Sequence, residues 1–219
     1  MTLQRPDGET VAGFGRRVLD RASAGDVTGG CVVDLVDRPA VAGTGLPAPG
    51  SPPLDALVEL WPEDQAAAVA TLDAWRADPA LGVRAGYVAD EVVQRDYPRT
   101  WPDGEPSPGI KVVYLVRRTP GITVDEFLRH WHEVHGPLAL RHHVGAWKYV
   151  QNAVRERLAA ADPDVVGLAE LHFPTVGDLV DRMYDSGEGR RAIGADVVQF
   201  VGGADAYLTS EHVLQAPPG

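Results

Sequence analysis

Two segments of this chain repeat the same pattern, and this internal similarity constrains the fold more than any other feature. Residues 54–77 and 166–185 both read as a strand, a Pro-containing turn and a helix. A glutamate occupies the same place in each copy, Glu59 in the first and Glu170 in the second. Similarity at a fixed offset is typical of a duplicated structural unit. The sequence therefore predicts two related α+β units.

The remaining elements of both units follow from periodicity. In the first unit we expect a helix over 9–21, a strand over 30–37 and a closing strand over 86–94. Little sequence precedes residue 9, so the opening strand of this unit is expected to be incomplete. In the second unit we expect strands over 111–118, 145–151 and 168–172, and a last alternating strand near 197–201.

A Pro-rich stretch separates the two units. Residues 97–109 contain four prolines and read as an extended linker. The predicted domains are therefore residues 1–96, the linker 97–109, and residues 110–219. A second Pro- and Gly-rich segment, 39–53, is long for a loop inside a compact domain. It has the composition of a lid or a partner-binding arm, and disorder is the simpler interpretation.

One helical motif, Phe127 to Leu138, distinguishes the second unit. At about 3.6 residues per turn its aromatic and apolar side chains form one stripe, and His135 lies on that buried stripe. His130 is expected to face water, and the Gly-Pro pair after His135 is expected to end the helix. A histidine on a buried face titrates near neutral pH, as a general acid or base requires. Capping of the helix end by His135 explains the pattern equally well.

This motif is one of a series. It follows a strand that ends in Arg-Arg and precedes Trp147-Lys-Tyr149-Val-Gln151-Asn and a C-terminal strand ending near Val213. In this order and spacing, residues 109–215 resemble the EthD family of the dimeric α/β-barrel (ferredoxin-like) superfamily. The first half, whose helix lacks both the aromatic-histidine face and the His-Gly-Pro sequence, resembles a degenerate tandem copy.

The resemblance implies a fold and a general activity. It implies an α+β protein in which two tandem ferredoxin-like units pair antiparallel sheets into an α/β barrel. It also implies a cofactor-independent enzyme of secondary metabolism that acts on an aromatic or polyketide-like small molecule. Monooxygenases, dehydratases, cyclases and isomerases occur in this superfamily. Histidine-mediated proton transfer is the chemistry that these residues favour.

The candidate catalytic residues are His135, His132 and Tyr149, and five further residues are candidates for substrate binding: Trp131, Trp147, Gln151, Tyr114 and His172. Strand alternation places Trp147, Tyr149 and Gln151 on one face, but periodicity does not tell which face meets the helices. Tyr149 and Gln151 match a Tyr-x-Gln pattern of the family.

Several of these residues also have simpler structural interpretations. Trp131 suits the core, His132 a half-exposed surface, and His172 a packing role, because it aligns with Trp61 in the first copy. The presence of Glu59 and Glu170 in both copies favours an architectural role over catalysis. The neighbouring pair His142-His143 is expected at the surface or in a loop and is a weak signal for metal, so no metal site is predicted.

Composition limits the partners. A net charge of −11 disfavours nucleic acid and anionic membrane surfaces. The single cysteine, Cys31, lies in an apolar run, which predicts a buried thiol and a cytoplasmic protein. The N-terminal residues show no apolar signal-peptide core. We expect either a monomeric fused barrel or a homodimer.

Two other classes of protein stay open. A histidine in an apolar pocket also suits an axial haem ligand, as in haem-binding relatives of this fold. A non-catalytic protein that binds a small ligand would keep the pocket and lose the chemistry. No glycine-rich nucleotide loop, nucleophile elbow or Cys-x-x-Cys spacing is present, so the expected enzyme uses no cofactor.

Overall fold

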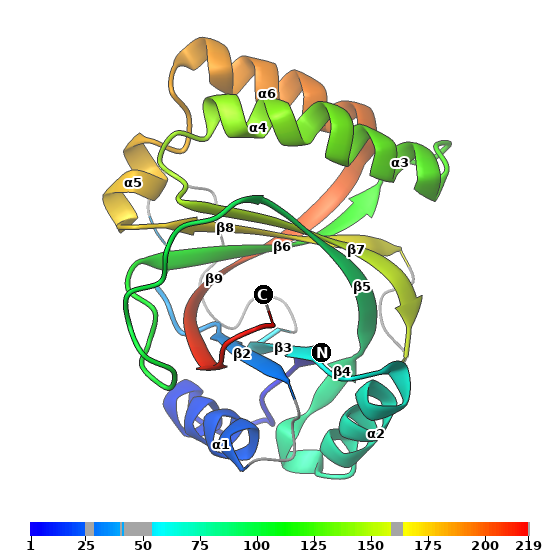
Figure 1. Cartoon of the computed structure of the whole chain (residues 1–219), viewed down its shortest axis with the longest axis vertical. Helices are drawn as coiled ribbons and strands as arrows, with labels where there is room; N and C mark the ends of the chain where they lie inside the picture. Colours follow the sequence, from blue (N-terminus) through cyan, green and yellow to red (C-terminus); the bar gives the residue numbers. More distant parts are fainter. Residues whose placement is uncertain (25–28, 40, 42–53, 159–163, 219) are drawn as a thin grey trace.

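The computed structural model describes residues 1–24, 29–39, 41, 54–158 and 164–218. These form one antiparallel sheet with helices on its outside (Figure 1). The order of its nine strands is β4-β1-β3-β2-β9-β6-β8-β7-β5. The strands are β1 (Thr2–Leu3), β2 (Gly30–Leu35), β3 (Ala56–Trp61), β4 (Val83–Ala85), β5 (Tyr87–Arg95), β6 (Ile110–Arg118), β7 (Lys148–Arg157), β8 (Val165–Phe173) and β9 (Val201–Gln215). The α+β class predicted from the sequence is confirmed.

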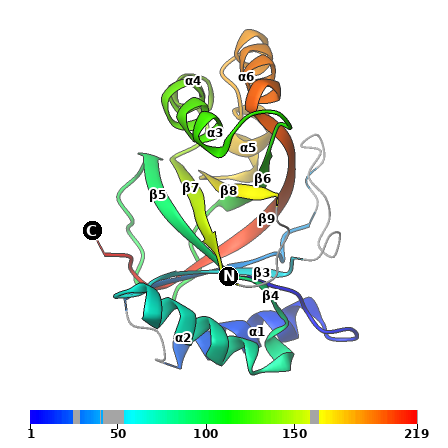
Figure 2. The same ribbon diagram turned by 90° about the vertical axis from the view of Figure 1, so that its right-hand side faces the viewer.

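Helices follow the strands in both halves of the chain. They are α1 (Val11–Ser23), α2 (Gln65–Arg76), the 3-10 turn η1 (Pro79–Leu81), α3 (Val124–His130), the π-helical turn η2 (Trp131–His135), α4 (Gly136–His142), α5 (Val176–Asp181) and α6 (Gly187–Phe200). Helices α3, α4 and α6 lie together over strands β6 to β9, whereas α1 and α2 lie at the opposite end of the molecule (Figure 2). No helix in the described ranges is long and apolar enough to cross a membrane.

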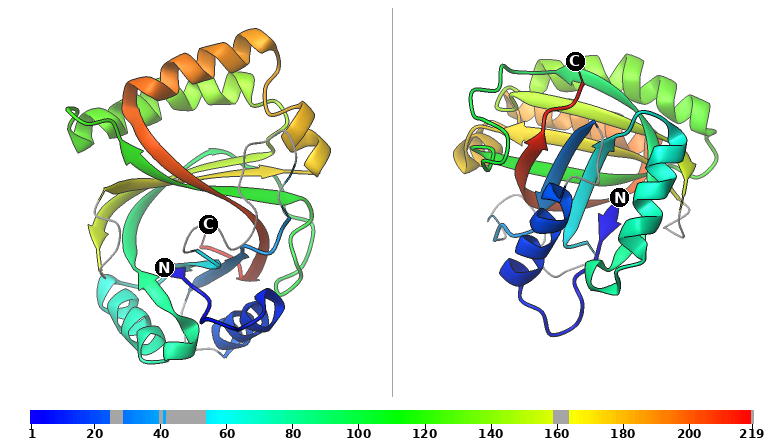
Figure 3. Two further views of the ribbon diagram at one scale, coloured as in Figure 1. Left: turned by 180° about the vertical axis from the view of Figure 1, so that it is seen from behind. Right: turned by 60° about the horizontal axis from the view of Figure 1, so that its bottom comes forward.

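The two halves of the chain are joined through the sheet. The first part of β9 pairs with β6, and its last part pairs with β2, so one strand belongs to both halves. Strand β5 pairs with β7 at the other end of the strand order, and only Gly86 separates β5 from β4. The sheet consequently curves around a central region between the two groups of helices (Figure 3).

Three apolar clusters stabilise this arrangement. One lies under α3, α4 and α6 and contains Phe127, Trp131 and Phe200, each at most 2% exposed. A second contains Phe14 and Trp75 and packs α1 and α2 on the first half of the sheet. A third lies on the sheet face away from α4 and α6. Burial on this scale is the main source of stability in a domain of this size.

The expected end of the motif helix at Gly136-Pro137 is wrong, because the chain stays helical to His142. The π-turn η2 accommodates the proline. The amide of Gly136 donates to the Trp131 carbonyl, one residue further back than in an α-helix, and Pro137 falls in the first turn of α4. In that position the missing proline N–H has no intrahelical partner to lose.

The strand expected near 197–201 is also wrong, because residues 187–200 form helix α6 and β9 begins at Val201. Ser186 caps this helix by accepting from the Gly189 amide, and Ile193 and Phe200 are buried at helical spacing. The helix expected over 176–185 ends at Asp181. The loop 39–53 lies almost entirely outside the described residues.

Candidate active site

A cavity of about 200 Å³ lies between the η2 turn, helix α6 and the sheet. Its wall is mostly apolar and aromatic, with a few polar groups. It is lined by Tyr114, Val116, Trp131, His135, His143, Tyr149, Ala169, Leu171, Met183, Tyr184, Ile193, Val197, Phe200, Val201 and Ala204. An apolar cavity of about 150 Å³ is known to hold benzene, so this one suits a small aromatic molecule. Such composition is typical of ligand sites.

His135 is the best placed base in this cavity. It is 8% exposed, and its Nδ1 lies 2.8 Å from Asp196 Oδ2. Since a carboxylate only accepts, Nδ1 carries the proton and Nε2 is the nitrogen left for the cavity. Burial lowers the pKa of His135, although the Asp196 carboxylate partly opposes this. The imidazole is therefore neutral at pH 7, in the form that accepts a proton.

Asp196, on α6, also binds His130, whose Nε2 lies 2.8 Å from Oδ1. The expectation that His130 faces water is wrong, because its side chain is only 23% exposed and stacks on Phe200. One buried carboxylate thus fixes two histidines. Asp196 was missed because the sequence was read as a strand near 197–201, whereas its spacing from Ile193 and Phe200 fits one helix.

Tyr149 supplies a hydrogen-bond donor to the same cavity. Its hydroxyl accepts from Gln151 Nε2 at 2.7 Å and from the Trp131 side chain. With both lone pairs used, its own hydrogen is free to donate into the cavity. Burial raises the pKa of Tyr149, so the phenol stays protonated. Tyr149 thus suits stabilisation of a negative charge on a ligand oxygen.

Gln151 and His132 lie behind Tyr149 and are absent from the cavity lining. Gln151 Oε1 accepts from His132 Nδ1 at 2.7 Å and from Gln94 Nε2 at 2.9 Å, and its Nε2 also donates to the Trp131 carbonyl. Gln151 is fully buried with these partners. The network orients Tyr149, so Gln151 is a supporting residue.

Two further polar groups line the cavity. Burial raises the pKa of Tyr114 and lowers the pKa of His143 to about 4. His143 lies directly after α4, in one of its two expected positions, but it is buried: it is 7% exposed and its Nδ1 donates to the Met183 carbonyl at 2.7 Å. His142 is less buried and contacts Asp185. Among the described residues no group of His, Cys, Asp and Glu has the arrangement of a metal site.

Trp147 and His172 are not brought to His135. Trp147 stacks with Tyr97 and Trp101 of the linker, so residues 97–109 pack on the second half. His172 lies on the face of β8 opposite to Ala169 and Leu171, which line the cavity. Of the eight candidate residues, the cavity contains four: Trp131, His135, Tyr149 and Tyr114.

The chain is similar to known proteins both in its fold and in part of its sequence. The fold is shared with solved structures of α+β proteins over nearly the whole chain. One is an anthrone oxidase-like protein, 13% identical, with a TM-score of 0.62, covering 97% of this chain and 89% of that one. Another is a candidate monooxygenase from Fusobacterium nucleatum, 10% identical, with a TM-score of 0.52, covering 98% and 89%.

The family resemblance is confirmed for the second half of the chain. Residues 119–204 match the family model of the EthD domain. An EthD family protein from Bacillus halodurans is 19% identical, covers 46% of this chain and 95% of its own, and has a TM-score of 0.35. The sequence matches no curated protein. The matched segment carries His135, Tyr149 and Asp196.

Proposed function

We propose that the cavity between η2, α6 and the sheet is the active site of a cofactor-independent enzyme. Its substrate would be an aromatic or polyketide-like small molecule. The observation that carries this proposal is His135, held in one tautomer by Asp196 at 2.8 Å on the wall of an aromatic cavity. A base positioned by a carboxylate is a recurrent catalytic arrangement.

The proposed step is removal of a proton from an acidic carbon or phenol. Nε2 of His135 would accept the proton, and the resulting enolate or phenolate oxygen would accept a hydrogen bond from Tyr149. The charge that forms on imidazolium lies next to Asp196, which compensates it. Apolar walls exclude water and strengthen both interactions. The carbanion could then eliminate, isomerise or react with oxygen.

The proposed oxygenation is supported by two fold relatives, which are described as an anthrone oxidase-like protein and a monooxygenase. At 10–13% identity they support the fold, and the reaction of this chain is our inference. A haem with His135 as its axial ligand is the second candidate, and a purified protein without a Soret band would exclude it. An accessory protein that only binds the ligand is the other alternative, and it predicts the same exchange rate for His135→Ala as for the wild type.

We further propose that the halves, 1–96 and 110–219, are duplicated units that together form the barrel. The strand order is β4-β1-β3-β2 in the first half and β9-β6-β8-β7 in the second. In both halves the fourth strand of the unit therefore comes first in the sheet, followed by the first, the third and the second. The pairing of β5 with β7 and of β9 with β2 would close the sheet within one chain. A monomer or homodimer in the cytoplasm, with no nucleic-acid partner, is consistent with this arrangement.

Proton abstraction can be measured directly with anthrone as a probe. We expect the protein to accelerate exchange of the acidic methylene hydrogens for deuterium, followed by NMR, and oxygen consumption to accompany it if oxygenation follows. His135→Ala should lower the exchange rate by roughly 10²–10⁴-fold. His142→Ala removes a histidine outside the cavity and should leave the rate unchanged. Equal rates in both variants, with intact circular dichroism, would refute the role of His135.

A further inference from the structure

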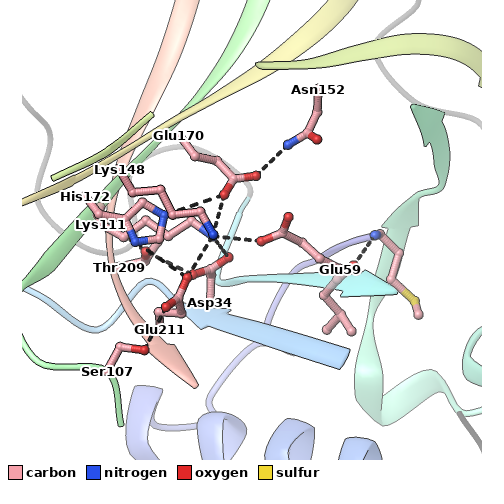
Figure 4. Close-up of polar contacts among 12 residues, drawn as sticks. Asp34, Glu59, Ser107, Lys111, Lys148, Asn152, Glu170, His172, Thr209 and Glu211 are labelled. Carbon is pink, nitrogen blue, oxygen red and sulfur yellow. Dashed lines mark hydrogen bonds and ion pairs between the residues drawn. The ribbon is translucent and has the colours of Figure 1, made fainter. Parts of the chain in front are cut away.

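A second cluster of charged residues lies on the sheet face away from the His135 cavity, and it surrounds one buried lysine (Figure 4). Lys111, on β6, is 2% exposed. Its Nζ lies 2.8 Å from Asp34, 2.7 Å from Glu59, 2.8 Å from Glu170 and 3.4 Å from Glu211. An ammonium has three hydrogens, so four carboxylates exceed what Lys111 can satisfy.

Neutral donors satisfy some of the remaining oxygens. Ser107 donates to Glu211 Oε1 at 2.7 Å, and Asn152 donates to Glu170 Oε1 at 2.6 Å. These groups add hydrogen bonds without adding positive charge. With Glu59 left aside, three carboxylates still surround one ammonium group, so the cluster keeps more negative charge than Lys111 balances, and buried unbalanced charge is costly.

His172 packs against the same cluster without lining the cavity beside it. The ring is 4% exposed and lies among Lys111, Glu170 and Glu211 (Figure 4). Its Nε2 is buried and makes no hydrogen bond; Glu170 Oε2 is 3.8 Å away, and Glu211 Oε2 is 3.6 Å from Nδ1. Both ring nitrogens thus face carboxylates just beyond hydrogen-bond distance, and His172 belongs to the buried inner side of the cluster.

A cavity of about 470 Å³ opens beside this cluster. Its charged wall has five carboxylates and three cationic groups: Glu59, Glu91, Asp96, Glu170 and Glu211, with Arg99, Lys111 and Lys148. Arg99 is paired with Asp103, outside the cavity lining. Tyr97 and Trp61 add aromatic surface. The cavity is separate from the His135 cavity, because successive residues of β8 face opposite sides of the sheet.

We propose that this cavity binds a small aliphatic amine. A protonated amine brings both missing features, a positive charge and several N–H donors. Glu91 would receive the ammonium group on its carboxylate, and Glu59, which also lines the cavity and reaches the buried cluster, would accept through its carbonyl oxygen. The aromatic rings of Tyr97 and Trp61 would contact the cation or its carbon chain. This site is distinct from the proposed reaction site and does not depend on it.

Calorimetric titration with 1,4-diaminobutane at pH 7 tests this proposal, with 1,4-butanediol as a neutral molecule of the same length. We expect heat of binding for the amine alone. Glu91→Gln should weaken binding about tenfold, because a charge-assisted contact is lost. The matched control is Asp90→Asn, on the same strand, whose side chain is 61% exposed and pairs with Arg155. This control should bind the amine like the wild type.

Three results would overturn the proposal. They are no binding of the amine, equal binding of the diol, or equal affinities in Glu91→Gln and Asp90→Asn. Magnesium chloride that displaces the amine and binds more tightly would assign the cavity to a hydrated metal ion instead. Circular dichroism of both variants would show that a loss of binding is not a loss of fold.

Discussion

At the scale of single residues, the His135–Asp196 pair is the feature on which the proposed chemistry depends. Asp196 does not line the cavity, so it acts through the imidazole. Its carboxylate fixes the tautomer and raises the pKa of His135 against the effect of burial. Asp196 is therefore a positioning residue.

Replacing Asp196 by Asn should reduce the rate and also change its pH dependence. A base works only when deprotonated, so the rate rises with pH through the pKa of His135. Without the Asp196 charge that pKa falls, and the rising limb should move to lower pH while the maximal rate drops by roughly 10²-fold or more. The pH–rate profile of anthrone exchange measures both effects. An unshifted limb would indicate that Asp196 only stabilises the helices.

The sequence identified His135, Tyr149, Tyr114 and Trp131 because they lie on regular strands or on a helical stripe, where spacing predicts which residues share a face. It missed Asp196 because the segment was read as a strand, and because its contact with His135 joins residues 61 positions apart. It assigned His172 to the site because alternation defines a set of residues but not which side of the sheet that set occupies. It assigned Trp147 to the site because alternation grouped it with Tyr149, whereas β7 begins only at Lys148. The burial of His130 and His143 was missed because their partners, Asp196 and the Met183 carbonyl, are distant in sequence.

At the scale of elements, the packing of the η2 turn on strand β8 depends on a glycine. A Cβ built at Gly167 would lie 2.4 Å from the Trp131 ring, and Trp131 is 2% exposed. A glycine in a strand often marks such a close approach. The π-turn, the tryptophan and the glycine thus form one contact that sets the depth of the cavity.

Gly167→Ala should consequently destabilise the protein by about 1–3 kcal/mol, because a rigid ring must move in a packed core. Urea denaturation followed by circular dichroism measures this. Gly203→Ala, in β9, is the matched control: its Cβ would meet nothing within 4 Å, and its effect should be near zero or slightly stabilising. Similar losses in both variants would contradict the proposed contact.

At the scale of the whole molecule, Lys111 connects the two halves. Its carboxylate partners include Asp34 and Glu59 from the first half and Glu170 from the second. The sequence identified the two equivalent glutamates and assigned them an architectural role, and both contact this lysine. Nothing in the sequence indicated that a lysine would lie between them, because the position of Lys111 follows from how the two halves of the sheet pair.

Lys111→Met should destabilise the protein by about 3–5 kcal/mol, because several buried carboxylates would lose their cation. Lys148→Met is the control, since its side chain is 28% exposed and its ion pair with Asp96 is 4.0 Å long. Its expected effect is below about 1 kcal/mol. Urea denaturation of both variants makes the comparison. Equal free energies of unfolding for Lys111→Met and Lys148→Met would mean that the cluster contributes little to the contact between the two halves of the chain.

The same cluster predicts a stability maximum between two pH limbs. Burial raises the pKa of Asp34 and, well above its usual range, that of Glu59. When the pKa of a carboxyl is higher in the folded than in the unfolded protein, its contribution to the free energy of unfolding is complete below the unfolded-state pKa. That contribution is lost as the pH rises through the folded-state pKa. Against the effect of burial, His172 and Lys111 lower the pKa of Glu211 to about 2, so its contribution is present above the unfolded pKa and lost as pH falls toward 2. His143, lowered from 6.5 to about 4, adds a loss of stability as pH falls through that range.

Urea denaturation across pH 3–10 should therefore show stability declining on both sides, and two substitutions separate the limbs. Glu59→Gln mimics the protonated carboxyl, so it should flatten the alkaline limb and leave the acid limb in place. His143→Asn removes the group that the fold holds neutral, so it should reduce the loss between pH 6.5 and 4 even if it lowers stability at pH 7. An alkaline limb unchanged in Glu59→Gln would mean that this carboxyl is already ionised at neutral pH. The excess negative charge beside Lys111 would then have to be balanced by another group or a bound cation, which makes this titration a direct check on the charge state of the second cavity.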